Sequence, residues 1–227
     1  LAGSISNTVG RSLLIENTAA GTTIDLRNAT VQDSGSGVLI SDVVGDVQLN
    51  DVTVTGGTGT GIEVTGNSGT VIFNGLTSVS GNAGRGINVH DTVDLVDVVD
   101  DPLTPENEST VGIIEGQVFF SEVNIAADGQ TGLVASNATS LQITNGTITA
   151  TNMGAVADIS DSLIDIRLRS IFADGGPIAP FAPFAVNIAD TAGTFAALGD
   201  GSGTAGSGGL IQNMTTAVTL SNAGTVF

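Results

Sequence analysis

The chain has 227 residues, of which 41% are hydrophobic and 12% are charged, and its formal net charge is −18. Nucleic acids and anionic membranes are bound through basic patches, so this charge argues against both as partners. The lack of cysteine excludes a disulfide framework and a thiolate metal site, and no apolar stretch reaches the roughly 18 residues needed for membrane insertion.

A short pattern opened by a small residue recurs eight times along the chain. An apolar residue follows each opener, a second one stands two positions later, and most copies have Asn or Asp five positions after the opener. The openers are Ser12, Gly37, Gly61, Gly86, Gly132, Gly154, Ala185 and Ala217. Because Asn, Asp and Gly tolerate a left-handed backbone, each copy predicts a short strand that ends in a tight turn.

Two further apolar pairs follow the opener in most copies, which predicts three strands per coil. Second strands are predicted at 24–26, 47–49, 71–73, 118–120, 141–143 and 166–168. Third strands are predicted at 29–31, 52–54, 123–125, 146–148 and 171–173. Leu76 and Val79 break the spacing of the third coil, and Ile159 stands where the sixth coil should have its turn residue.

Three strands and three turns per coil predict an all-β fold, a right-handed single-stranded parallel β-helix of about seven to eight coils. We expect one such domain over residues 1–227. A single coil cannot bury its inward side chains, so the coils above and below must cover them.

The repeat is clearest at Gly37-Val-Leu-Ile-Ser-Asp42, Gly61-Ile-Glu-Val64 and Gly84-Arg-Gly-Ile-Asn-Val89. It resembles the right-handed parallel β-helix repeat family, the pectate-lyase-like solenoids of exported bacterial enzymes, adhesins and surface proteins. The resemblance covers essentially the whole chain and implies the architecture, but this superfold hosts many functions. The low charge and the abundance of Thr, Asn and Gly favour an extracellular or cell-surface location.

Insertions are predicted at about 93–116, 175–184 and 199–209. The first is rich in carboxylates, which are the ligands that Ca²⁺ prefers, so it is either a calcium site or a solvated acidic loop. The candidate ligands are Asp97, Asp100, Asp101, Glu106 and Glu108. In the second insertion, Phe181 and Phe184 either bind a partner protein or pack on their own coil. The third is rich in Gly and Ser and predicts a flexible loop.

Carbohydrate-active enzymes of this fold place two or three carboxylates near a cation on one outer face, and this is the alternative function. The best local cluster is Asp158, Asp161 and Asp165, with Arg167 and Arg169. The same residues fit turn caps and outward cross-strand pairs. The chain has a single histidine, His90, and no Trp or Tyr to stack on sugars, so we predict no catalytic residue and no enzyme.

Both ends have the sequence of half a coil: 11 residues precede Ser12, and Ala217 opens the last 11. Neither half shows a helix or a polar cap that would protect open strand edges. We therefore expect copies to meet head to tail, as a polymer of subunits or as a tandem array in one larger polypeptide. The predicted contact residues are Leu1, Ile5, Val9, Val218, Leu220, Val226 and Phe227. The expected function is a structural or adhesive extracellular solenoid, with cell-surface glycans as a further candidate ligand.

Overall fold

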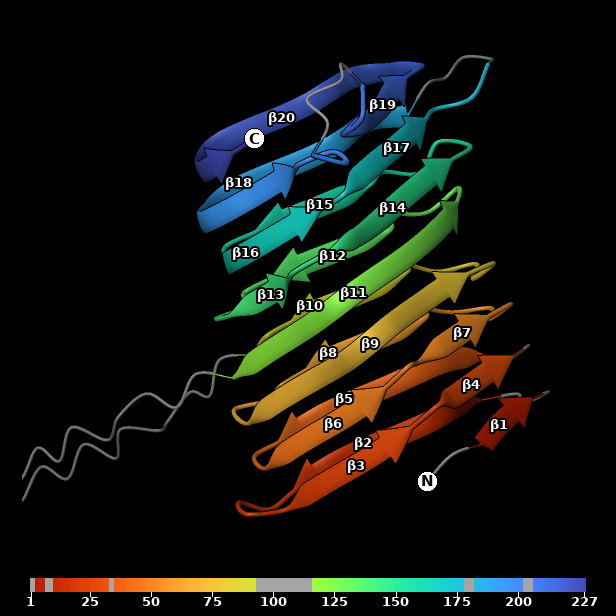
Figure 1. Ribbon diagram of the computed structural model, residues 1–227, viewed down its shortest axis with the longest axis vertical. Coiled ribbons are helices and arrows are strands. Elements are labelled where there is room, and N and C mark those ends of the chain that lie inside the picture. The colour runs from red at the N-terminus through yellow and green to blue at the C-terminus, as the bar shows by residue number, and fades with distance from the viewer. Residues whose placement is uncertain (1–2, 7–9, 33–34, 93–115, 178–181, 202–205) are drawn as a thin grey trace, which may run out of the picture.

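The computed structural model describes residues 3–6, 10–32, 35–92, 116–177, 182–201 and 206–227, and among these residues it contains strands and no helix (Figure 1). No helix that could cross a membrane occurs in this part of the chain. The strands are β1 (Gly3–Ser6), β2 (Arg11–Thr18), β3 (Thr23–Arg27), β4 (Ala29–Gln32), β5 (Ser36–Val43), β6 (Asp46–Asn50), β7 (Thr53–Thr55), β8 (Ile62–Thr65), β9 (Thr70–Ser80), β10 (Ile87–His90), β11 (Gln117–Asp128), β12 (Leu133–Ser136), β13 (Leu141–Ile143), β14 (Gly146–Thr151), β15 (Ala157–Ser160), β16 (Leu163–Leu168), β17 (Ser170–Asp174), β18 (Ala182–Ala197), β19 (Gly209–Gln212) and β20 (Met214–Val226).

These strands stack in three parallel ladders, which form the three faces of a solenoid (Figure 1). The first face contains β2, β5, β8, β10, β12, β15 and the first parts of β18 and β20. The second contains β3, β6, the first parts of β9 and β11, β13, β16 and the last parts of β18 and β20. The third contains β1, β4, β7, the last parts of β9 and β11, β14, β17 and β19.

Each face of the described chain therefore has eight levels, and every pairing between levels is parallel. The predicted fold class, an all-β stack of parallel coils, is confirmed. The coils at the two ends are partial, because β1 lies on the third face alone and β20 covers only the first and second faces.

The core consists of apolar columns that run along the axis of the stack. On the first face, Val38, Ile62, Ile87 and Leu133 follow one another and are almost completely buried. On the second face, the rings of Phe73 and Phe120 stack with their centroids 4.4 Å apart. Each fully buried large side chain contributes about 1.5–3 kcal/mol, so the repeated columns oppose the entropy lost on ordering the chain.

The corner that ends the first face has a left-handed backbone at every level. The residues there have φ between 47° and 63°, and they are Asn17, Asp42, Gly66, Asp91, Asn137, Asp161, Asp190 and Asn222. A left-handed conformation is tolerated by Gly, Asn and Asp and penalises other residues. The Asn/Asp position of the repeat is therefore a backbone requirement, as the sequence predicted.

The sixth coil differs from the prediction by two residues. Leu133 pairs with Ala157 and Ala135 pairs with Ile159, so Ile159 is an inward residue and Asp161 is the turn residue. Gly154 belongs to the preceding turn, where its N–H donates to the carbonyl of residue 151. The small residue of a turn was mistaken for the small residue that opens a strand. The second strand is displaced too, since its inward pair is 164/166 and not 166/168.

The third coil has an irregular corner within β9. Gly75 has a φ of 68°, and the side chain of Leu76 is exposed. Thr77 takes the inward position opposite Val123 and is fully buried. The predicted break in spacing at Leu76 is real, and an inward threonine accommodates it.

Candidate functional site

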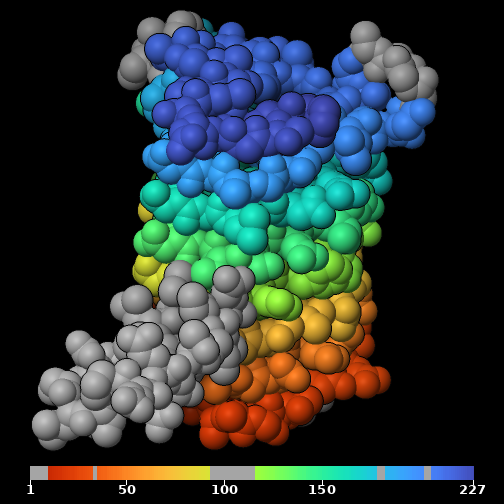
Figure 2. All heavy atoms as spheres, turned by 90° about the vertical axis from the view of Figure 1, so that its left-hand side faces the viewer, coloured from red at the N-terminus to blue at the C-terminus, as the bar shows by residue number. Residues whose placement is uncertain are grey.

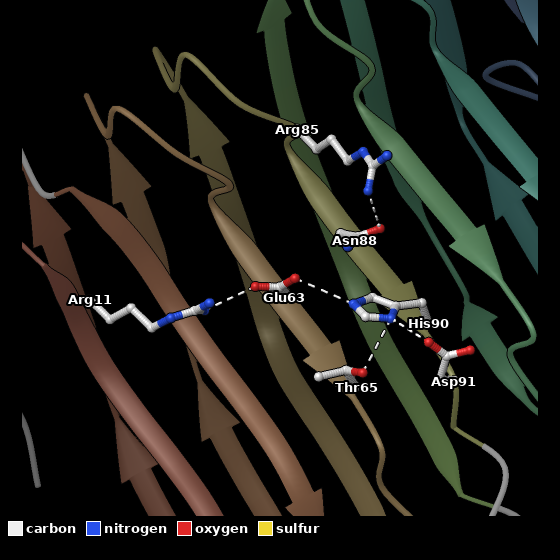
Figure 3. A network of polar contacts seen from close by, with 7 residues as sticks. All are labelled: Arg11, Glu63, Thr65, Arg85, Asn88, His90 and Asp91. Carbon is white, nitrogen blue, oxygen red and sulfur yellow. Dashed lines mark hydrogen bonds and ion pairs between the residues drawn. The ribbon is translucent and has the colours of Figure 1, made fainter.

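A network of polar side chains lies on the outer surface of the first face, over β8 and β10 (Figure 3). Glu63 of β8 is central to it: its Oε2 accepts a hydrogen bond from Arg11 at 2.9 Å, and its Oε1 lies 3.3 Å from Nε2 of His90. Arg11 is on β2, and β5 lies between β2 and β8. The arginine side chain therefore bridges two levels of the stack.

The network continues through the histidine ring toward the next level. His90 Nδ1 lies 2.9 Å from Oδ2 of Asp91 and 3.2 Å from Oγ1 of Thr65. Asp91 also accepts a hydrogen bond from the Asn137 amide at 3.1 Å. The two ring nitrogens of His90 therefore face two different carboxylates, Nε2 that of Glu63 and Nδ1 that of Asp91.

These contacts hold both carboxylates in the ionised form. Burial works against the charge of Glu63, but hydrogen bonds from Arg11 and His90 outweigh it and hold its pKa below the ordinary value. Hydrogen bonds from His90 and Asn137 lower the pKa of Asp91. Carboxylates with lowered pKa values suit ion pairing across levels, whereas a general acid needs a raised pKa.

The predicted carboxylate cluster is not brought together. Asp158 points outward from β15 on the first face, where it accepts a hydrogen bond from the amide of Asn187 at 2.9 Å. Asp161 occupies the corner, with a φ of 47°. Asp165 lies on β16 of the second face and pairs with Arg167 at 2.9 Å. The alternative interpretation is right for Asp161, which is a turn residue, but Asp158 bonds across strands and not at a turn, and Asp165 pairs with Arg167 of its own strand.

The last residues of the chain form one end of the stack (Figure 2), and β20 carries an apolar surface there. Val218 and Leu220 continue the inward columns of Val186 and Ile188, yet they are 42% and 52% exposed, compared with 2% and 1% one level below. Phe227 is 74% exposed, and Val226 is half-buried. We call Val218, Leu220, Val226 and Phe227 the tail surface.

The opposite end of the stack is also incompletely covered. Leu13 of β2 and Ile24 and Leu26 of β3 hold inward positions and are half-buried, while Ile15 is 7% exposed. We call these four residues the head surface. Ile5 lies on β1 opposite Val31, and the predicted contact residues Leu1 and Val9 fall outside the described residues.

The predicted insertions are only partly described. Strand β18 begins at Ala182, within the second predicted insertion, so Phe184 is a half-buried strand residue opposite Thr216 of β20. Phe181 falls outside the described residues, as does the whole calcium set of Asp97, Asp100, Asp101, Glu106 and Glu108. The described residues contain no group of three or more potential metal ligands. The calcium site stays a prediction, tested by melting the protein with and without millimolar Ca²⁺.

The sequence analysis missed the Arg11–Glu63–His90 network because its members lie 52 and 27 residues apart. A signal was available in the repeat. Once the coils are aligned, Glu63 falls beside Asn88, and Thr65 falls beside His90. Reading the outward residues in register, as was done for the inward ones, would have brought the carboxylate and the histidine together.

Comparison of the chain with family models, with curated proteins and with solved structures found no match in any of the three.

Proposed function

We propose that this chain is a non-catalytic, extracellular structural or adhesive solenoid that associates end to end through its tail and head surfaces. The observation that carries the proposal is the exposure of Val218 and Leu220. They stand in columns whose members between the two ends of the stack are buried, and a further level of strands would cover them.

Two physical costs at the tail favour such a contact. Burial of apolar surface stabilises a protein by about 25 cal/mol for each Å² removed from water. The apolar side chains of the tail surface that stay in water do not contribute this stabilisation. The outer edge of β20 also presents peptide groups that a further strand would pair, and an open edge of this kind is a template for another chain. A contact between two different ends does not close on itself, so it builds a fibre.

The charged surface supports a structural function over a catalytic one. Among the described carboxyls, those of Asp25, Glu63, Asp91 and Asp174 have shifted pKa values, and all four are lowered by hydrogen bonds. A glycosidase of the two-carboxylate type needs one carboxylic acid that keeps its proton. Ion pairing and hydrogen bonding within and between coils are the roles that these groups fit.

A carbohydrate-active β-helix of the pectate-lyase-like kind is the second candidate, and the Arg11–Glu63–His90 cluster is what favours it. A carboxylate, an arginine and a histidine share one outer face there. Incubation with pectic and neutral polysaccharides tests this candidate: cleavage that disappears in Glu63→Gln would replace the structural proposal.

Electron microscopy and light scattering of the full chain test the proposed association. We expect unbranched filaments with an axial repeat of roughly 35–40 Å, from eight levels at about 4.8 Å each. Leu220→Asp should abolish them by placing a charge in the contact, and Thr219→Asp, on the outward side of the same strand, should keep them. Monomers at all concentrations and salt conditions would overturn the proposal.

A further inference from the structure

The two ends of the stack have complementary steps. At the C-terminal end, β20 supplies the eighth level of the first and second faces, and β19 supplies the eighth level of the third face from the preceding coil. At the N-terminal end, the third face begins with β1, one coil earlier than β2 and β3 begin the other two faces. Among the described residues, no third-face strand follows β20, and no strand of the first or second face precedes β1.

The apolar columns at the two ends also correspond. Extending the ladder by one level places Leu13 over Val218 and Ile15 over Leu220 on the first face, because those pairs stand in the same columns. Leu26 falls over Val226 on the second face by the same rule. In these three columns apolar side chains of the two ends would meet, whereas the columns of Ile24 and Ile5 lead to Gly193 and Gly209.

Charge is distributed so that the ends do not repel each other. Residues 206–227 contain no charged side chain, and residues 1–27 contain Arg11, Arg27, Glu16 and Asp25, which balance. The whole net charge of −18 therefore falls on residues 28–205. Stacking along the axis places neutral ends in contact, whereas side-by-side packing would bring the acidic regions together.

We propose that the tail of one copy receives the head of a second copy in the register of the internal ladders. Strand β1 of the second copy pairs with β19 and completes the coil that β20 begins, while β2 and β3 pair with β20. This proposal rests on the end-to-end association proposed above, and it adds the partner strands and their register.

Cysteine cross-linking tests the register, because the chain has no cysteine of its own. Leu14 and Thr219 are exposed outward residues of one column on the first face. Neighbouring strands lie about 4.8 Å apart, within the 4.4–6.8 Å Cα separation of disulfides. A mixture of the single variants Leu14→Cys and Thr219→Cys should give a covalent dimer under mild oxidation, and neither variant alone should.

A matched pair of variants checks the position along the strand. Glu16 and Ser221 share the next outward column, two residues further along. We expect Glu16→Cys to link with Ser221→Cys and not with Thr219→Cys, since two residues along a strand add nearly 7 Å. On the third face, Ser6→Cys should link with Leu210→Cys, because both positions extend one column.

The outcomes separate this proposal from the association on which it rests. Filaments in which Thr219→Cys links to itself would show a tail-to-tail contact and overturn the register, although self-association would stand. A link between Glu16→Cys and Thr219→Cys would overturn it as well. Links on the first face without the Ser6–Leu210 link would overturn the completed coil, and the absence of any assembly would overturn both proposals.

Discussion

The first-face parts of β18 and β20 are nearly the same structure in two surroundings. Val186 and Val218 occupy one inward column, and Ile188 and Leu220 occupy the next. The residues of β18 are buried between two levels, while those of β20 have a level on one side only. The repeat pattern therefore determines which way a side chain points, and its burial depends on the next level of the stack.

The sharpest test of this comparison places one charge in both surroundings. Ile188→Asp should cost several kcal/mol, because an aspartate without a partner would be buried in the apolar column. Leu220→Asp should change the free energy of unfolding of the monomer by less than about 1 kcal/mol, because water reaches that position. Chemical denaturation at low protein concentration measures both.

Low concentration keeps end-to-end association from adding to the stability of Leu220. Equal destabilisation by the two variants would mean that β20 is covered in solution, and the comparison between the two levels would fail.

A methyl group added to the backbone sharpens the contrast between a covered level and the end of the stack. A Cβ at Gly37 would collide with the carbonyl oxygen of Gly61 in the next level, whereas a Cβ at Gly10 meets nothing within 4 Å. Gly37→Ala should cost about 1–3 kcal/mol from overpacking, and Gly10→Ala should stay within about 0.5 kcal/mol. Thermal unfolding of the two variants measures both effects. Equal destabilisation would mean that neighbouring levels move apart easily enough to accommodate the added methyl group at Gly37.

At the turns, substitution of an exposed residue can still change the free energy of unfolding. Asp42 is exposed but has a φ of 52°, and Gly66 holds the same corner one level on. We expect Asp42→Ala to cost about 1 kcal/mol, because alanine tolerates the left-handed region poorly. Asp42→Gly should be close to neutral. If the two variants melt alike, side-chain contacts and not the backbone maintain this corner.

Much of the fold could be predicted from the sequence because the repeat carries two independent signals. Alternating apolar residues identified the inward columns, and Asn or Asp identified the corners, so most strands were predicted correctly. The sixth coil failed where the signals competed: Gly154 looked like an opener, although Ile159 fits the inward column and Asp161 the corner. Giving the corner residue more weight than the opener would have corrected it.

The outer surface was less predictable for a physical reason. Inward residues obey one requirement, apolarity, so each can be recognised alone. Glu63, Arg11 and His90 matter only as a set, and the register of four levels must be known before they can be placed together. The exposure of the tail surface is likewise a property of the stack and not of any single residue.

Lowering the pH should have the smallest of these effects. It acts on the ionisable groups of the outer surface and not on the apolar core of the covered levels. The folded-state pKa of Glu63 lies below its ordinary value, which is about 4.3, so its contacts stabilise the fold above that pH. The contribution falls as the pH drops through the lower folded-state pKa, and we expect it to stay under about 1 kcal/mol because the pair is partly exposed.

Neutralising the other carboxylates reduces their mutual repulsion and acts in the opposite direction, so the useful quantity is the difference in unfolding free energy between the unsubstituted protein and Glu63→Gln. That difference in unfolding free energy should shrink between pH 6 and pH 3, and it should shrink at pH 6 when salt is added. A difference that is constant with pH would mean that Glu63 contributes through packing and not through its charge.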